Sequence, residues 1–340
     1  MLTYRTRRTL GKLGKFLVIS AIVFVVVWVC WLLWLGRFVV YTADGAQFRL
    51  DQPYIFEGGE VAVPPEHETV AVYYNEGSDK VNTSTELGII YGYYATTNML
   101  LDSVEDVEKA ISDLPSGSAV MLDLKSIYGN FYYNTTIPGA PVADQIDADA
   151  VDKLISRLAM ADYYLIARVP AFRDRAYGLE NPNYGLPTSK GYLWSDDKSC
   201  YWLNPASNGA LNYLISIANE LRELGFDEVV FTEFLFPEAS AIVFNSAMTC
   251  SEAIAQAANV LVTSCATETF AVSFQTEDQS FVLPQGRTRL YLTNVSAAKA
   301  QAVMDTIDVP VKESQLVFLT ETFDTRYDIC SVMRPLSIVN

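Results

Sequence analysis

Near-continuous apolar runs alternate with amphipathic segments from residue 87 onward. The amphipathic segments carry apolar residues at helical spacing, as in SVEDVEKAISDL, where Ser103 is a predicted N-cap and Asp106 completes a capping box. The apolar runs are predicted strands because they are rich in β-branched and aromatic residues. Seven such strands are found, at 87–94, 119–125, 163–169, within 227–239, and at 269–275, 289–295 and 315–321.

Strands that are apolar throughout and alternate with helices predict a parallel sheet covered on both faces. We expect an α/β fold, a (β/α)8 TIM-type barrel of regular or irregular form, over residues 86–340. One of its eight strands is then missing, short or supplied by residues 69–74. A doubly wound sheet is the alternative, but no glycine-rich phosphate loop follows the first strand.

Residues 16–36 are predicted to be a transmembrane anchor. The segment FLVISAIVFVVVWVCWLLWL, residues 16–35, has no charged residue and is long enough to cross a bilayer core of roughly 30 Å. A cleaved signal peptide usually has a shorter apolar region, about 7 to 15 residues. The basic tail 1–15 predicts a cytoplasmic N-terminus and an extracellular C-terminal domain in the cell membrane. Residues 37–85 would be a stalk and lead-in segment.

Charge excludes one class of partner. Five of the 24 basic residues lie in the tail 1–15. The rest of the chain has 19 basic and 40 acidic residues, which give it a formal net charge of −21. Nucleic-acid binding needs basic patches that neutralise phosphates. We therefore expect no nucleic acid as a partner, and the sequence leaves protein partners open.

The four cysteines after the anchor are Cys200, Cys250, Cys265 and Cys330. Cys250 and Cys265 bracket one predicted helix, which at 1.5 Å per residue would hold them about 22 Å apart, too far for a disulfide. If two disulfides exist, Cys200 pairs with one of these two. Free buried thiols are the alternative.

The types of residue present exclude several kinds of catalytic and metal site. The single histidine, His67, precedes the barrel, which argues against a Ser-His-Asp or Cys-His system. It also excludes a zinc site built on histidines. No ligand spacing implies a metal, although Asp196 and Asp197 could hold calcium weakly. No cofactor is expected.

Carboxylates remain as candidate catalytic groups. Active sites in this fold lie at the C-terminal ends of the strands, where Asp123, Glu233 and Glu321 are predicted. Two carboxylates that flank a sugar suffice for glycoside hydrolysis. We take Asp123 and Glu233 as the acidic pair and Glu321 as a reserve. Each of them could instead belong to a structural network of ion pairs.

Five segments resemble, in order and spacing, those of a bacterial family of putative glycosyl hydrolase domains. They are GIIYGYY, AVMLDLKSIYG, LIARVPAFRD, LWSDDKSCYWLNPAS and ELGFDEVVFTEFLFP. The resemblance extends over about residues 86–240. It implies a TIM barrel related to the α-amylase-like barrels, and its kept residues include Asp123, Lys125 and Arg168.

The fourth predicted strand departs from the family pattern. The family usually has a phrase such as FDYVRFP where this chain has FTEFLFP, so Thr232 stands at the acid position, Glu233 at the aromatic and Leu235 at the arginine. Side chains alternate along a regular strand, so Thr232 and Glu233 cannot both point inward. Glu233 points into the helix layer, or turns over the barrel mouth if the strand bulges or ends. The cost of burying an unpaired carboxylate favours the second alternative.

Six residues are predicted to bind substrate. Lys125 and Arg168 would orient the sugar or tune the carboxylates. Aromatic faces suit sugar rings, although packing in the core is the alternative for each of them. The full set is Lys125, Arg168, Trp194, Trp202, Asn204 and Tyr93.

The leading hypothesis is a membrane-anchored exported protein of the glycoside hydrolase type that acts on cell-envelope or extracellular polysaccharide. A catalytically inactive relative, used for glycan binding or as an envelope scaffold, is the alternative. A purely structural partner protein, with the groove filled by its own side chains, is a third.

Overall fold

The structure is a computed structural model that describes residues 28, 39–42, 45–48, 87–278 and 280–337. The predicted anchor, apart from Trp28, and the segment 69–74 lie outside these residues. Within the described part of the chain, no helix has the length and apolar character needed to cross a membrane. Strands β1 (Val39–Thr42) and β2 (Gly45–Phe48) form an antiparallel pair in a unit separate from the rest.

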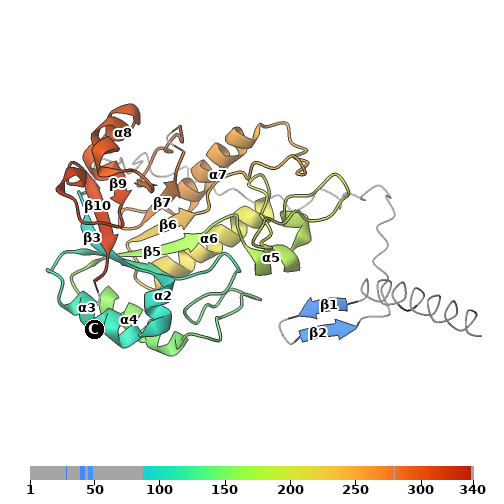
Figure 1. Ribbon diagram of the computed structural model, residues 1–340, viewed down its shortest axis with the longest axis horizontal. Coiled ribbons are helices and arrows are strands. Elements are labelled where there is room, and N and C mark those ends of the chain that lie inside the picture. Colours follow the sequence, from blue (N-terminus) through green and yellow to red (C-terminus); the bar gives the residue numbers. More distant parts are fainter. Residues whose placement is uncertain (1–27, 29–38, 43–44, 49–86, 279, 338–340) are drawn as a thin grey trace, which may run out of the picture. The chain divides into compact units, whose positions relative to one another are not determined.

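Eight parallel strands close into a barrel, which confirms the predicted TIM-type fold (Figure 1). Around the barrel the order is β10-β3-β4-β5-β6-β7-β8-β9. The strands are β3 (Tyr91–Ala95), β4 (Ala119–Asp123), β5 (Tyr164–Pro170), β6 (Glu228–Thr232), β7 (Ala271–Thr276), β8 (Leu290–Leu292), β9 (Leu316–Leu319) and β10 (Ser331–Pro335).

The strand that the sequence did not reveal is β10. It pairs with β3 on one side and β9 on the other, so it closes the barrel, and residues 69–74 are not needed for closure. Its sequence SVMRP is short, carries an arginine and ends in proline, so it lacks the apolar run by which the other strands were predicted.

Helices cover the outside of the barrel. They are α2 (Thr97–Asp102), α3 (Val104–Ser112), α4 (Ala148–Ala159), α5 (Arg175–Glu180), α6 (Asn208–Glu223), α7 (Cys250–Cys265), α8 (Ala300–Thr306) and α9 (Lys312–Gln315), with 3₁₀ turns η3 (Pro182–Tyr184), η4 (Ala297–Lys299) and η5 (Thr325–Tyr327). The predicted cap is confirmed: the Ser103 side chain accepts a hydrogen bond from the backbone N–H of Asp106. The 3₁₀ turn η4 leads directly into α8.

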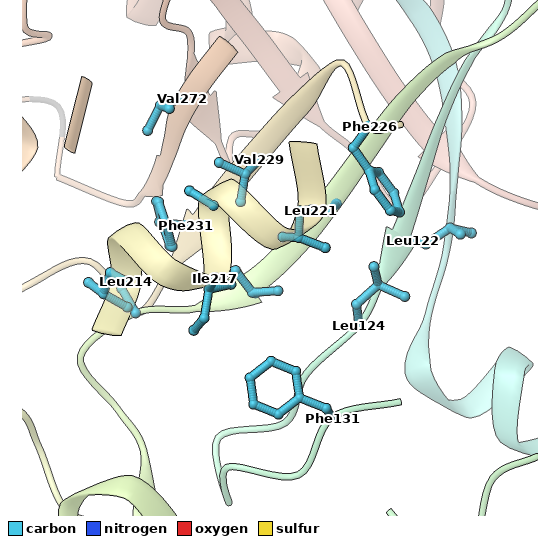
Figure 2. Packing of buried hydrophobic residues seen from close by; sticks show 14 of the residues in the cluster. Leu122, Leu124, Phe131, Leu214, Ile217, Leu221, Phe226, Val229, Phe231 and Val272 are labelled. Carbon is cyan, nitrogen blue, oxygen red and sulfur yellow. The ribbon is translucent and has the colours of Figure 1, made fainter. Parts of the chain in front are cut away.

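The largest core lies between the strands and the helix layer. Figure 2 shows Leu214, Ile217 and Leu221 of α6 turned toward Val229 and Phe231 of β6. These side chains are fully buried, and each contributes roughly 1.5–3 kcal/mol of apolar transfer free energy relative to full exposure. This packing fixes α6 against β6 and therefore the point at which β6 ends.

A charged cluster fills the barrel interior at the N-terminal ends of the strands. Glu228, the first residue of β6, forms an ion pair with Arg289 and accepts hydrogen bonds of 3.0 Å from the hydroxyls of Tyr164 and Tyr291. All three Arg289 nitrogens have acceptors, including the carbonyl oxygens of Ser314 at 2.9 Å and Gly88 at 3.0 Å. We call these four side chains, Glu228, Arg289, Tyr164 and Tyr291, the basal cluster.

Cys200, Cys250, Cys265 and Cys330 are all free thiols, as in the second alternative predicted from the sequence. The helix predicted between Cys250 and Cys265 is α7. Cys200, Cys265 and Cys330 are buried. Burial raises the pKa of the Cys265 and Cys330 thiols to about 12, so they are protonated and unreactive at neutral pH.

Candidate functional site

Polar side chains from five adjacent strands face the barrel interior at its C-terminal end. The strand pairing settles their direction: Val230, Ile166 and Tyr291 belong to the interior cluster, and residues at even spacing along the same strands, or paired with them, share that face. We call this set the barrel mouth. It consists of Tyr94 on β3, Asp123 on β4, Arg168 on β5, Thr232 on β6 and Gln275 on β7, together with Glu321, which follows β9.

Asp123 and Arg168 form a two-point ion pair at the mouth. The Asp123 Oδ1 lies 2.5 Å from Arg168 Nε, and Oδ2 accepts from Nη2 at 2.8 Å. The backbone N–H of Thr97 donates to the same Oδ2 at 3.3 Å. Both side chains keep 15% exposure. The carboxylate is therefore held in one orientation and still reaches solvent.

Tyr94 connects this pair to the opposite part of the barrel. Its ring lies 5.4 Å from the Arg168 guanidinium carbon, and its hydroxyl donates to the Thr320 carbonyl at 3.1 Å. Burial raises the pKa of Tyr94, and Glu321 and Asp123 add to that rise while Arg168 opposes it. Glu321, which is exposed, thus belongs to the same neighbourhood as Asp123. The sequence predicted Tyr93 as a binding residue and did not predict Tyr94, the next residue of β3, which belongs to the interior cluster.

Strand β6 ends at Thr232, and the next residue leaves the strand direction. Glu233 has φ of 51°, in the left-handed region that non-glycine residues rarely adopt. Thr232 keeps the inward direction, and the Glu233 carboxylate contacts Arg173 beyond the C-terminal end of β5, with 3.5 Å between Oε1 and Nη1. Of the two alternatives for Glu233, the structure has the one in which the strand ends and the carboxylate lies on the C-terminal face.

A second group of charges surrounds Arg173. Its Nη2 lies 2.5 Å from Asp196 Oδ2 and 3.8 Å from Asp197 Oδ1, and its guanidinium carbon lies 5.6 Å from the Trp202 ring. The Trp202 indole N–H donates to Asp196 at 3.0 Å. Although burial opposes it, hydrogen bonds from the Cys200 backbone, Trp202 and Arg173 hold the pKa of Asp196 below its ordinary value. We call Arg173, Asp196, Trp202 and Glu233 the Arg173 cluster.

Lys125 does not fit the predicted role in substrate binding. Its side chain has no exposed surface and forms an ion pair with Asp174, with 2.6 Å between Nζ and Oδ2. Asp174 also caps α5 through the Tyr177 N–H and accepts from the Tyr213 hydroxyl. Strand β4 ends at Asp123. The Lys125 side chain is buried beneath the loops that follow the strands and does not point into the barrel mouth. The pair therefore fastens the β4 and β5 loops to α6.

Three further predicted residues lie where packing or turn formation accounts for them. Tyr93 is partly buried against the helix-facing core. The Asn204 side chain accepts from the Ala206 N–H at 3.0 Å, which shapes the turn before α6. Trp202 is 5% exposed. The ring centroids of Trp194 and Trp202 are 6.5 Å apart. Trp194 is partly exposed, so of these two tryptophans it is the one whose ring a ligand can reach.

In the described residues, no three His, Cys, Asp or Glu side chains are grouped so that they could hold a metal ion. The polar groups at the mouth are two carboxylates, one guanidinium group, two hydroxyls and an amide. This set can bind sugar hydroxyls and, with two carboxylates, can perform acid–base chemistry on a glycosidic bond.

Comparison with solved structures finds several carbohydrate-active enzymes. An α-galactosidase from Lactobacillus brevis matches with a TM-score of 0.50 and 10% identity, covering 75% of this chain and 39% of that one. A GH20 exo β-N-acetylglucosaminidase from Vibrio harveyi has a TM-score of 0.47 and 12% identity, covering 68% and 41%. The chain thus spans about two fifths of these enzymes. At these identities the likeness concerns the fold alone.

A hypothetical protein from Ruminiclostridium thermocellum is also similar, with 23% identity and a TM-score of 0.46. The match covers 53% of this chain and 96% of that one. No curated protein matches the sequence. A family model described as "Putative glycosyl hydrolase domain" matches residues 93–271, which are 179 of the 340 residues. The resemblance found in the sequence is confirmed, and the chain belongs to this family of glycosyl hydrolase-like domains.

Proposed function

We propose that the chain is an exported, membrane-anchored glycoside hydrolase that acts on cell-envelope or extracellular polysaccharide through Asp123 and Glu233. Membership of the family supports an activity on carbohydrate. The observation that carries the proposal is the left-handed backbone of Glu233, which directs a carboxylate to the same end of the barrel as Asp123. Such a conformation costs about 1–2 kcal/mol, and strain of this kind is concentrated at functional sites.

The contacts of the two carboxylates suit different roles. Asp123, fixed by Arg168 and the Thr97 N–H, would act as the base or nucleophile, because its orientation is set before substrate binds. Glu233 keeps 29% exposure, and its contact with Arg173 is long, so it would be the proton donor. Glu321 is the reserve, since it is exposed and close to Tyr94.

The test is release of reducing ends from a panel of bacterial and plant polysaccharides by the full-length protein in mild detergent. Asp123→Asn and Glu233→Gln should each lower the rate by about 100-fold or more. Glu105→Gln on the exposed face of α3 is the matched control and should leave the rate unchanged. If Asp123→Asn and Glu233→Gln both cleave as well as the control, these carboxylates are not the catalytic pair.

Glycan binding without hydrolysis is the second candidate, and one observation favours it. Both oxygens of Asp123 already accept hydrogen bonds from Arg168, and Thr232 fills the inward position where the family usually has an acid. A protein of this kind would bind an oligosaccharide by calorimetry and release no reducing ends from it. Its binding would survive Glu233→Gln.

Anchoring through residues 16–36 rests on the sequence alone. The full-length chain should remain in the membrane pellet after alkaline carbonate extraction. A chain that lacks residues 1–36 should appear in the supernatant. Added protease should digest the C-terminal domain in intact cells if that domain is extracellular. Pelleting of the shortened chain would contradict the anchor.

A further inference from the structure

Arg168 of the barrel mouth and Arg173 of the Arg173 cluster already form ion pairs with carboxylates. Arg168 is held by Asp123, and Arg173 lies within 4.0 Å of carboxylate oxygens of Asp196, Asp197 and Glu233. Lys125 is buried against Asp174. An acidic sugar that entered here would have to displace one of these carboxylates from its arginine before it could form an ion pair of its own.

The barrel mouth and the Arg173 cluster together carry more negative than positive formal charge. With Asp197 included, they contain two arginines and the five carboxylates of Asp123, Asp196, Asp197, Glu233 and Glu321, a difference of −3. A sugar carboxylate, sulfate or phosphate would add a like charge. Like charges at the entrance of a partly desolvated site repel a ligand, and water screens them less there than at an open surface.

An uncharged acceptor lies on the same interior face of the barrel as Asp123 and Arg168. Gln275 is in the inward face of β7, one residue from the C-terminal end of that strand, and its side chain is partly exposed. Its Oε1 is buried and has no hydrogen-bond partner in the described part of the chain. A buried carbonyl oxygen without a donor costs free energy, so a donor brought by a ligand would remove that cost.

We propose, on the basis of the carbohydrate function above, that the barrel mouth selects glycans without acidic groups and that Gln275 is a specificity-determining residue. The partly exposed Gln275 side chain turns on binding, so that Oε1, which has no accessible surface in the free protein, accepts a hydrogen bond from a hydroxyl or amino group of the sugar. Thr232, on the neighbouring strand and facing the same interior, supplies a second uncharged polar group. The mouth therefore takes neutral sugars or amino sugars.

The experiment is calorimetric titration of the full-length protein in detergent with oligosaccharides of equal length. The probes are a β-1,4-glucose hexamer, its glucuronate counterpart, a β-1,4-N-acetylglucosamine hexamer and its de-N-acetylated form. Neutral or amino forms should bind at least tenfold more tightly than the glucuronate form. Affinity for the glucuronate form should rise as sodium chloride is added, because salt screens like-charge repulsion.

Equal or tighter binding of the glucuronate oligomer would overturn the inference and leave the proposed carbohydrate function in place. If none of the four oligomers binds and no polysaccharide is cleaved, both proposals fail. These results are distinguishable, because the first concerns the ratio between two ligands and the second concerns any ligand at all.

Gln275→Met tests the residue itself. It should weaken binding of the preferred oligomer about tenfold and leave the unfolding midpoint unchanged or slightly higher, because the lost oxygen has no partner in the free protein. Gln301→Met on the exposed side of α8 is the control and should change neither quantity. Lower stability with unchanged affinity would show that Gln275 serves the fold and not the ligand.

Discussion

Both ends of the barrel interior contain arginine–carboxylate ion pairs, but these pairs differ in how far they are buried and in how fully they are hydrogen-bonded. In the basal cluster every Arg289 nitrogen has an acceptor, and both partners of the ion pair are 0–1% exposed. At the other end the Asp123 and Arg168 side chains are each 15% exposed. There Glu233 has a strained, left-handed backbone, and its carboxylate lies 3.5 Å from Arg173. A satisfied and closed cluster serves stability, whereas a partly open one is available to a ligand.

The largest effect is expected from Arg289→Met. This change leaves the buried Glu228 carboxylate without its cation, and the free energy of unfolding should fall by about 3–5 kcal/mol. Urea denaturation followed by circular dichroism measures the change. Arg326→Met, which removes an exposed ion pair with Asp324, is the control and should have little effect. A loss below about 1 kcal/mol would mean that the ion pair of the basal cluster contributes little to stability.

Arg168→Met should cost less stability, about 1–3 kcal/mol, because Asp123 keeps solvent contact and the Thr97 N–H. The same change should abolish turnover or binding of the glycan that the wild type accepts. Arg168→Lys is the informative companion, since lysine keeps the charge but not the two-point geometry. Suppose that Arg168→Met destabilises the protein as strongly as Arg289→Met and leaves glycan turnover intact. The barrel mouth would then serve stability, as the basal cluster does, and not ligand binding.

Glu233→Gly should stabilise the protein by about 1 kcal/mol while it removes the activity. Glycine adopts φ of 51° without the steric cost that glutamate has there, and the contact that is lost, to Arg173, is long. Thermal unfolding and the cleavage assay are measured together. Asn294→Gly, at φ of 58°, is the control for strain alone and should leave activity unchanged.

The smallest expected effect is on the pH dependence of stability. The pKa of Asp196 is lowered in the folded protein, so its ionised form stabilises the fold at pH values above the ordinary range of aspartate, near 4. That contribution is lost as the pH falls through the lower folded pKa. Wild type and Asp196→Asn should therefore differ in melting temperature at pH 6 and converge near pH 2–3. A difference that persists at low pH would assign the effect to lost hydrogen bonds and not to charge.

The sequence predicted the barrel because seven strands are apolar on both faces, a property that burial between helices and interior imposes. It could not predict β10, since a short strand that closes a barrel is stabilised by its two neighbours and needs no apolar run of its own. The C-terminal positions of Asp123 and Arg168 followed from the strand ends. Their pairing did not, because it depends on the register between β4 and β5.

Substrate binding by Lys125 is the interpretation that the structure argues against, because its side chain has no exposed surface and is paired with Asp174. The sequence placed Lys125 at the end of its strand, whereas β4 ends two residues earlier, at Asp123. Beyond the end of a strand, the alternation of side chains no longer sets their direction. Glu233 is a second example, since β6 ends at Thr232 and the left-handed backbone of Glu233 turns its carboxylate to the C-terminal face.

The closure of the barrel by its last strand has a consequence for biosynthesis. Residues 96–330, 235 in all, are made between the end of β3 and the start of β10. At about 5–20 residues per second this takes roughly 12 to 47 s. Throughout that interval one edge of β3 has no partner strand, and unpaired edges invite pairing with other chains. The nascent protein therefore exposes this edge to other chains until Ser331–Pro335 has been made, and a chain that stops short of Ser331 keeps the open edge permanently.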